Sequence, residues 1–233
     1  MSRVDINSEV SPEKLSSPPI ELVLQILEHV WHQGKTPSKK AYEEPLDGLI
    51  ETVLSQNTND RNRDVAFARL KALGSWEYID TIPREKVVEA IKPAGISNNK
   101  TKTIKRVLAA VKEKYGVYSL KSLKNGTAEE ARKFMTSIQG VGPKTAACVL
   151  AFDLGMPAFP VDTHVARISK RLGWAGGKET PSDIQARMEK LIPAEMKTAG
   201  HLNMIQHGKN ICKARTPCCS QCALRGICPS SMA

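Results

Sequence analysis

Lys144 and Asp162 have side chains that can do chemistry on a sugar. Lys144 directly follows the glycine-rich turn Gly140–Pro143, and Asp162 begins the next predicted helix, in FPVDTH. The positive end of the helix dipole disfavours the ammonium form of a lysine in the first turn. Its free amine can attack a sugar carbon, and a carboxylate can stabilise the sugar cation as the leaving group departs. Alternatively, Asp162 is only the N-cap of its helix.

The glycine-rich turn itself is typical of a phosphate-binding hairpin. Gly140 and Gly142 allow a tight turn and a close approach to another surface. A helix that begins at Pro143 directs its free N–H groups toward the turn, an arrangement that binds phosphate. The preceding helix opens with Thr127 and Glu130, which have the spacing of a capping box. The segment predicts a helix–hairpin–helix that holds a nucleic-acid backbone; a plain turn between packed helices is the alternative.

A second group of reactive residues is the C-terminal segment CKARTPCCSQCALRGIC. Four of its cysteines have the spacing C-x6-C-x2-C-x5-C: Cys212, Cys219, Cys222 and Cys228. Iron–sulfur clusters are commonly held by four thiolates, whereas four-cysteine zinc sites usually use two C-x2-4-C pairs. The pattern therefore favours an iron–sulfur cluster over zinc, and disulfides are a third interpretation. We expect Cys218 to be an unused neighbour and Cys148, in an apolar helix, to be a core residue.

Composition and charge indicate the class of partner. The 233 residues carry a formal net charge of +10, which suggests a polyanion such as nucleic acid, although a merely basic protein is the alternative. Basic residues crowd the short stretch that contains Lys100, Lys102, Lys105 and Arg106. No apolar run approaches the roughly 18 residues that a membrane span needs. We expect a monomer in the cytoplasm, associated with the nucleoid, with no membrane contact and with residues 1–18 as a flexible leader.

The elements that must position these residues are helices. Apolar residues recur at helical spacing, with proline or capping residues at several starts. The expected helices are 19–33, 45–56, 60–73, 83–92, 100–116, 127–138, 143–155, 162–174, 181–192 and a last one from 195 into 210–216. The predicted fold class is all-α.

With these motifs in view, the chain resembles the endonuclease III family of DNA glycosylases. Three signals carry the resemblance, in the family's order: IQGVGPKTA, FPVDTHVAR and the four-cysteine spacing, between Leu46 and Cys228. The resemblance implies a two-domain helix-hairpin-helix DNA glycosylase fold with DNA bound across the cleft. One domain would be a six-helix barrel at 38–156, with the helix-hairpin-helix at 127–152. The other would be a discontinuous [4Fe-4S] cluster domain at 19–37 and 157–233.

The same resemblance implies an activity and the residues that carry it. Lys144 would be the Schiff-base nucleophile, Asp162 the catalytic carboxylate, and the four cysteines the cluster ligands. The implied enzyme is a bifunctional DNA glycosylase and AP lyase of base excision repair. It would act on double-stranded DNA that contains a damaged base, an oxidised pyrimidine above all, or an abasic site.

Further loops would contact the DNA. In LSQNTND, Asn57 aligns with the family glutamine that fills the gap left by the flipped base, and Gln56 precedes it, so that either side chain could fill the gap. In PAGISNNK, Ile96 matches the apolar wedge, with an ordinary buried loop residue as the alternative. The remaining expected DNA contacts are Gly140, Val141, Gly142 and His164.

Two kinds of alternative remain at the level of function. The segments AFPVDTHVARISKRLGW and CALRGIC also resemble the plant branch that excises 5-methylcytosine, which usually has asparagine at the position of His164. A glycosylase for uracil or thymine opposite guanine is a further alternative for the substrate. A non-catalytic module that binds damaged DNA is an alternative of a different class, and the presence of both Lys144 and Asp162 argues against it.

Overall fold

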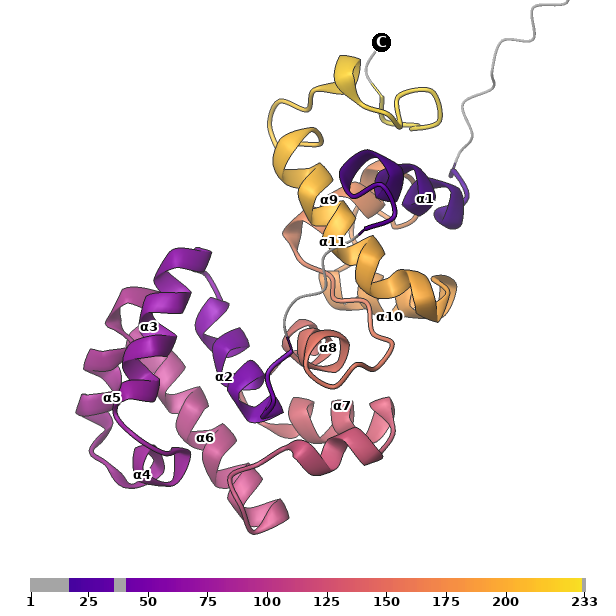
Figure 1. Ribbon diagram of the computed structural model, residues 1–233. Helices are drawn as coiled ribbons and strands as arrows, with labels where there is room; N and C mark the ends of the chain where they lie inside the picture. The colour runs from indigo at the N-terminus through magenta and orange to yellow at the C-terminus, as the bar shows by residue number, and fades with distance from the viewer. Residues whose placement is uncertain (1–16, 36–40, 232–233) are drawn as a thin grey trace, which may run out of the picture.

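The computed structural model describes residues 17–35 and 41–231, which form helices joined by short loops (Figure 1). The expected leader lies, apart from its last two residues, outside the described residues. The all-α prediction is confirmed, since no β-strand occurs in the described ranges. The α-helices are α1 (Ile20–Trp31), α2 (Pro45–Ser55), α3 (Asp60–Ala72), α4 (Trp76–Thr81), α5 (Arg84–Ala90), α6 (Ser97–Tyr115), α7 (Ala128–Ser137), α8 (Pro143–Phe152), α9 (Thr163–Arg171), α10 (Pro181–Leu191) and α11 (Ala194–Asn210). Short 3-10 turns are η1 (Lys92–Ala94), η2 (Lys121–Asn125) and η3 (Cys219–Gln221).

The buried apolar side chains form two clusters. The first is built by α2 to α8 and ends along the chain at Ala158. The second combines α1 with the chain from Phe159 onward, including α9 to α11. The first and last helices, α1 and α11, therefore lie side by side (Figure 1). Leu224, 2% exposed, anchors the cysteine segment to this second cluster. Among the described helices, none is long and apolar enough to cross a bilayer.

Local sequence signals explain most helix boundaries. Thr127 and Glu130 form the predicted capping box of α7, and Pro143 takes the first position of α8. The short helix α4 was not predicted; Ser75 caps it by accepting a hydrogen bond from Tyr78 N–H. The last helix ends at Asn210, earlier than expected, and Cys212 N–H bonds to the carbonyl of His207 instead of continuing the helical pattern to Gly208.

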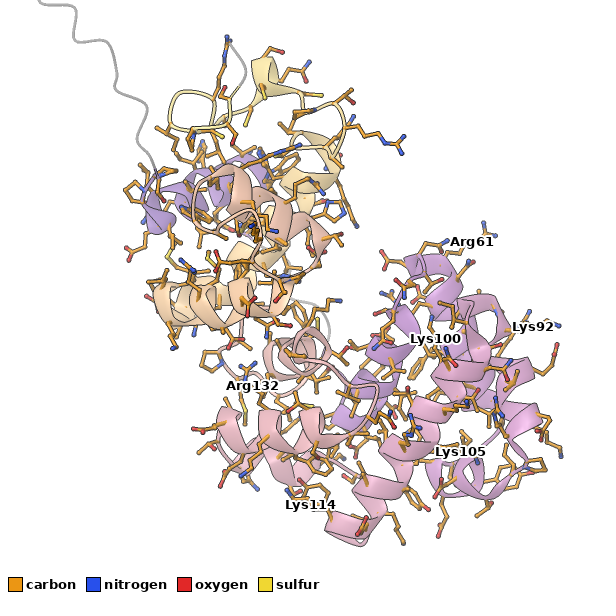
Figure 2. All side chains as sticks on the ribbon, turned by 180° about the vertical axis from the view of Figure 1, so that it is seen from behind. Arg61, Lys92, Lys100, Lys105, Lys114 and Arg132 are labelled. Atoms are coloured by element: carbon orange, nitrogen blue, oxygen red, sulfur yellow. The ribbon has the colours of Figure 1, made fainter. Side chains whose placement is uncertain are left out.

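The expected basic surface cluster on α6 is wrong in part. Lys100 is 4% exposed and donates to the carbonyls of Leu54 and Ala94 at 2.7 and 2.8 Å. Lys105 is half-buried and donates to three carbonyls around the end of α4, those of Ile79, Asp80 and Ile82 (Figure 2). Lys102 and Arg106 are exposed. Two of the four basic residues, Lys100 and Lys105, therefore donate hydrogen bonds to carbonyls inside the protein, because both lie on the face of α6 that packs against the core.

The turn between α7 and α8 packs its first glycine against α6. Gly140 has φ +102, and a Cβ there would lie 2.3 Å from Thr103 Oγ1. Gly142 is the N-cap of α8 with φ −89, and a Cβ there would have no atom within 4 Å. Only Gly140 is thus required by the fold, whereas Gly142 leaves open space in front of the helix.

We expect Gly140→Ala to lower the free energy of unfolding by about 2–4 kcal/mol, because it combines an unfavourable φ with a steric overlap. The matched variant Gly142→Ala should cost less than about 1 kcal/mol, the usual scale for a change at an N-cap. Urea unfolding followed by circular dichroism measures both. Equal losses in the two variants would contradict this interpretation of the turn.

Candidate active site and cysteine loop

Lys144 lies in the first turn of α8, directly behind the hairpin. The proline before it has no N–H to lose, and the first intrahelical bond joins Ala146 N–H to the carbonyl of Gly142. The Lys144 side chain is half-buried. Its position lets an amine reach the same space toward which the helix N–H groups point.

Asp162 is the N-cap of α9. Its Oδ1 accepts a hydrogen bond from Val165 N–H at 2.8 Å, and its backbone carbonyl accepts from Ala166 N–H. The capping role named as the alternative is therefore real. It does not exclude a catalytic role, because one carboxylate oxygen makes the cap and the side chain remains half-exposed.

Gln185 of α10 links the backbone segments that carry these two residues. Its Nε2 donates to the carbonyl of Pro143 at 3.2 Å, and its Oε1 accepts from Val161 N–H at 3.3 Å. Pro143 and Val161 immediately precede Lys144 and Asp162. Since Gln185 is 3% exposed, the amide is held by its surroundings and in turn fixes the spacing of the two loops.

His201 of α11 lies behind the same pair. Its Nδ1 is 2.8 Å from the carbonyl of Pro160, which can only accept, so that Nδ1 carries the proton. The ring packs between Phe152, at the end of α8, and Phe159. Burial lowers the pKa of His201 to about 4, while Asp162 raises this pKa and Lys144 lowers it. The charges of Asp162 and Lys144 therefore both act on one neutral imidazole.

Two loops of the first cluster expose the expected base-contacting residues. Gln56 Nε2 donates to the carbonyl of Gly140 and to Thr145 Oγ1, at 3.3 and 3.2 Å, so that this side chain is tied to the hairpin. Asn57 is exposed and left-handed, with φ +52. Ile96 is 54% exposed with φ +47 and is not the buried loop residue of the alternative.

The other expected DNA contacts differ in which of their atoms are exposed. The Val141 side chain is 4% exposed and belongs to the first apolar cluster, so that this residue offers only its backbone. Gly140 and Gly142 are exposed. His164 packs against Gly208, and its Nδ1 lies 3.1 Å from Arg167 Nη2. His164 thus borders the base of the cysteine loop.

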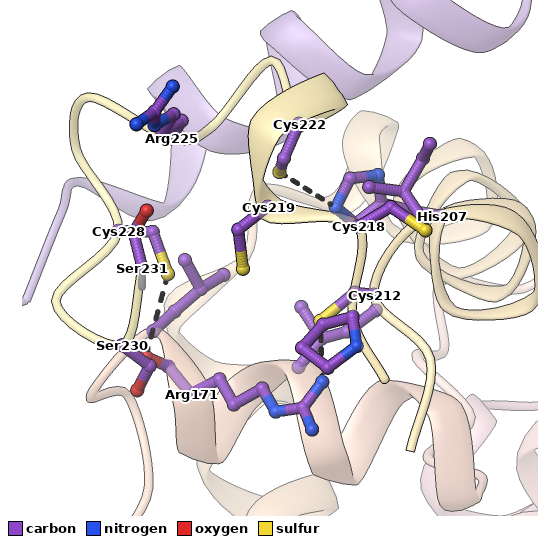
Figure 3. A pocket seen from close by; sticks show the side chains of 14 residues that line it. Arg171, His207, Cys212, Cys218, Cys219, Cys222, Arg225, Cys228, Ser230 and Ser231 are labelled. Atoms are coloured by element: carbon purple, nitrogen blue, oxygen red, sulfur yellow. Dashed lines mark hydrogen bonds between the residues drawn. The ribbon is translucent and has the colours of Figure 1, made fainter. Parts of the chain in front are cut away.

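The four spaced cysteines face one pocket beside α9 and α11 (Figure 3). Cys212, Cys219, Cys222 and Cys228 point their sulfur atoms into it, whereas the sulfur of Cys218 points away. Cys148 is buried in α8, as expected for a core residue. All six cysteines are free thiols, so that the disulfide alternative is wrong.

Basic groups surround this pocket. Arg171 Nη1 donates to Cys212 Sγ at 3.2 Å and to the carbonyl of Lys213, and Arg167 donates to the carbonyl of Cys212. Burial raises the pKa of the Cys222 and Cys228 thiols. Within residues 17–35 and 41–231, no three His, Cys, Asp or Glu side chains converge tightly enough to hold a single metal ion. Four thiols that face one pocket are a donor set that could hold a metal centre such as an iron–sulfur cluster.

Comparison with known proteins identifies the family. The model of the HhH-GPD superfamily base excision DNA repair proteins matches residues 50–194, which include both Lys144 and Asp162. The chain belongs to the HhH-GPD superfamily. It is 32% identical over 193 residues to endonuclease III of Thermotoga maritima, covering 82% of this chain and 86% of that protein. A putative DNA glycosylase of Arabidopsis thaliana is 34% identical over 76% of this chain, which spans 61% of that relative's length.

Solved structures agree with this HhH-GPD assignment. A trapped covalent endonuclease III–DNA intermediate superposes with a TM-score of 0.77 at 29% identity, covering 91% of this chain and 95% of that one. The protein is thus an endonuclease III-like DNA glycosylase of base excision repair with a fold that binds DNA.

In this HhH-GPD chain, two residues behind the site were missed from the sequence: Gln185 and His201. Gln185 sits between apolar positions of α10, which is the one signal that could have indicated a buried polar contact. His201 had no comparable signal, because its partners Pro160 and Phe152 come from distant segments.

The neutral state of His201 predicts a pH dependence of stability. A folded pKa near 4, against the ordinary value of 6.5, means that the unfolded chain binds this proton first as the pH falls. The stabilisation is therefore complete above about pH 6.5 and is lost toward pH 4. Between pH 6.5 and 5 the parent should lose about 1–2 kcal/mol more of its unfolding free energy than His201→Gln. Urea unfolding at the two pH values measures this difference, and parallel losses would contradict the buried neutral imidazole.

Proposed function

We propose that this protein is a bifunctional DNA glycosylase and AP lyase that removes damaged, oxidised pyrimidines. The observation that carries the proposal is the pairing of Lys144, in the first turn of α8, with Asp162, at the start of α9. Gln185 hydrogen-bonds to the segments before both residues, and the charges of both residues act on the pKa of His201. A buried brace of this kind holds reacting groups in a defined geometry, which is where much of a catalyst's advantage arises.

The proposed reaction begins with attack by the Lys144 amine on C1′ of the deoxyribose. A C–N bond forms while the glycosidic bond breaks, and the base leaves with the electron pair and takes up a proton. The Asp162 carboxylate stabilises the positive charge that develops on the sugar. The Lys144 nitrogen then loses a proton, and the C1′–O4′ bond breaks as O4′ takes up a proton, so that the opened sugar carries an iminium. The iminium makes the C2′ proton acidic, and its removal expels the 3′ phosphate by β-elimination and cuts the strand.

The DNA substrate is double-stranded and carries a damaged base or an abasic site. We propose that the exposed glycines of the hairpin and the α8 N–H groups hold phosphates and that Ile96 unstacks the base. His164 lies at the edge of the same surface. For the vacated gap we propose Asn57 rather than Gln56, because Gln56 is already bonded to Gly140 and Thr145. The protein would act as a monomer in the cytoplasm, on the nucleoid.

For the cofactor we propose a [4Fe-4S] cluster held by Cys212, Cys219, Cys222 and Cys228. The donor set suits it, because four cysteines line one pocket and iron–sulfur clusters are commonly held by four thiolates. When bound, the cluster supplies four iron–thiolate bonds that tie the loop together. Arg171 donates to the Cys212 sulfur. Leu224 and Arg171 keep the loop against α9 and the second apolar cluster.

We expect Lys144→Gln and Asp162→Asn to fail in different ways. Lys144→Gln should abolish the borohydride-trapped adduct and strand cleavage but keep most lesion binding, since it removes one of many cationic or N–H contacts. Asp162→Asn keeps an oxygen for the α9 cap. It should slow base release by about 10²–10³-fold, the scale of lost electrostatic stabilisation, yet still form adduct on a pre-made abasic site. Single-turnover assays and borohydride trapping measure both variants.

If Lys144→Gln cleaves abasic DNA as fast as the parent, the lysine is only a phosphate clamp and the enzyme is a monofunctional glycosylase. The substrate is tested with duplexes that each carry one base: thymine glycol, dihydrouracil, uracil or thymine opposite guanine, or 5-methylcytosine. Fastest release of an oxidised pyrimidine supports the proposal. A parent that binds these duplexes and releases nothing would instead support a non-catalytic binding module.

Cluster content gives an independent prediction. Anaerobically purified protein should contain about four iron and four acid-labile sulfide per chain, the composition of one cubane cluster. Cys218→Ser should keep this content, because its sulfur faces away from the pocket, whereas Cys212→Ser should lose it. Iron and sulfide analysis with the visible absorption spectrum measures both. One tightly bound zinc without sulfide would rule out the cluster.

A further inference from the structure

Lys100 connects two loops that the sequence places far apart. Its ammonium donates to the carbonyl of Leu54, in the last turn of α2, and to the carbonyl of Ala94, at the end of η1. Carbonyls at helix ends lack intrahelical partners and form the negative end of the helix dipole. One buried cation therefore joins the ends of two helical elements that are unrelated in sequence.

Each of these two carbonyls is followed within three residues by an exposed residue with left-handed backbone. Asn57 comes three residues after Leu54, and Ile96 comes two after Ala94. They are two of the three non-glycine residues with positive φ in the described chain. Left-handed backbone is especially unfavourable for a β-branched side chain, and such strain persists only where the surroundings over-determine it.

The backbone of Lys100 adds a third connection. Its N–H donates to the carbonyl of Ile96 at 3.1 Å. This is the ordinary first-turn bond of α6, so the side chain alone links the Ala94 carbonyl before Ile96 to the Leu54 carbonyl before Asn57. Burial lowers the pKa of Lys100, which reflects how little water reaches the ammonium. Burial of a charge is costly unless hydrogen bonds replace the lost water.

We propose that Lys100 is a positioning residue that locks the Asn57 and Ile96 loops into one unit, so that unstacking of the target base and filling of its gap occur together. The proposal rests on the proposed function, because it concerns how the duplex is opened for that chemistry. Lys100 contacts no reacting atom; it acts through the two residues that would enter the base stack.

Lys105 provides a matched control on the same helix. It too donates to helix-end carbonyls, at 2.6 to 3.0 Å, but these belong to the end of α4. Figure 2 labels both lysines, and Lys105 comes five residues after Lys100 on α6. Both Lys100→Met and Lys105→Met therefore remove hydrogen bonds from a lysine ammonium to helix-end carbonyls. Only Lys100→Met removes them next to the Asn57 and Ile96 loops.

The experiment compares two single-turnover rates for each variant. The first is base release from a fully paired duplex with the panel base that the parent releases fastest. The second is strand cleavage at a pre-made abasic site, where no base has to be unstacked. We expect the ratio of the first rate to the second to fall at least about tenfold in Lys100→Met, since base eversion carries a substantial free-energy cost. In Lys105→Met the ratio should stay within about twofold of the parent, the scatter of independent sites.

Two further measurements separate positioning from general loss of structure. Fluorescence of 2-aminopurine next to the target base should rise on binding of the parent and of Lys105→Met, and rise less with Lys100→Met. Combining Lys100→Met with Ile96→Ala should cost less than the product of the single effects, because both remove the same action. If Lys100→Met folds poorly, Lys100→Gln takes its place, and its ratio should again fall relative to Lys105→Met.

The outcomes separate the two proposals. An active parent with equal ratios in the Lys100 and Lys105 variants overturns the positioning role alone. A parent that releases no base from any duplex of the panel overturns the proposed function and this inference with it.

Discussion

The amide of Gln185 is the interaction on which the site depends most. It joins the carbonyl before Lys144 to the N–H before Asp162, and the two helices concerned, α8 and α9, contribute to different apolar clusters. An ion pair between Arg132 of α7 and Glu189 of α10, 2.8 Å apart, lies on the same side of the junction. Together with the packing of His201 between Phe152 and Phe159, these bonds fix α8 relative to α9. Because a misplacement of about 1 Å can cost about a hundredfold in rate, the chemistry is only as precise as this junction.

The positive charge of the chain is divided between interior and surface. Lys100 and Lys105 place their ammonium groups on helix-end carbonyls, and Arg167 and Arg171 do the same for the carbonyls of the cysteine loop. A cation that satisfies a carbonyl inside the protein contributes to net charge but little to close phosphate contacts. The net charge of +10 therefore overstates the number of residues that can contact DNA phosphates.

Sequence reasoning succeeded where the determining interaction is local. The Thr127–Glu130 capping box, the proline at the start of α8 and the all-α class all follow from residues within one helical turn of each other. It failed where the partner is distant. Charge spacing alone could not indicate that Lys100 bonds to Leu54, nor could a lone histidine indicate a bond to Pro160. The left-handed backbone of Asn57 and Ile96 was equally hidden, because neither residue type requires it.

The pairing of α1 with α11 has a consequence for the order in which the chain folds. Helices α2 to α8 are contiguous and can pack as they leave the ribosome. Helix α1 emerges earlier, yet its partners come much later: His32 bonds to Asn203, 171 residues away, and the Trp174 indole donates to the Pro18 carbonyl. The apolar face of α1, with Val23, Leu24 and Leu27, thus stays uncovered until nearly the whole chain has been made. The second cluster, whose contacts span more of the chain, is therefore expected to close later than the first.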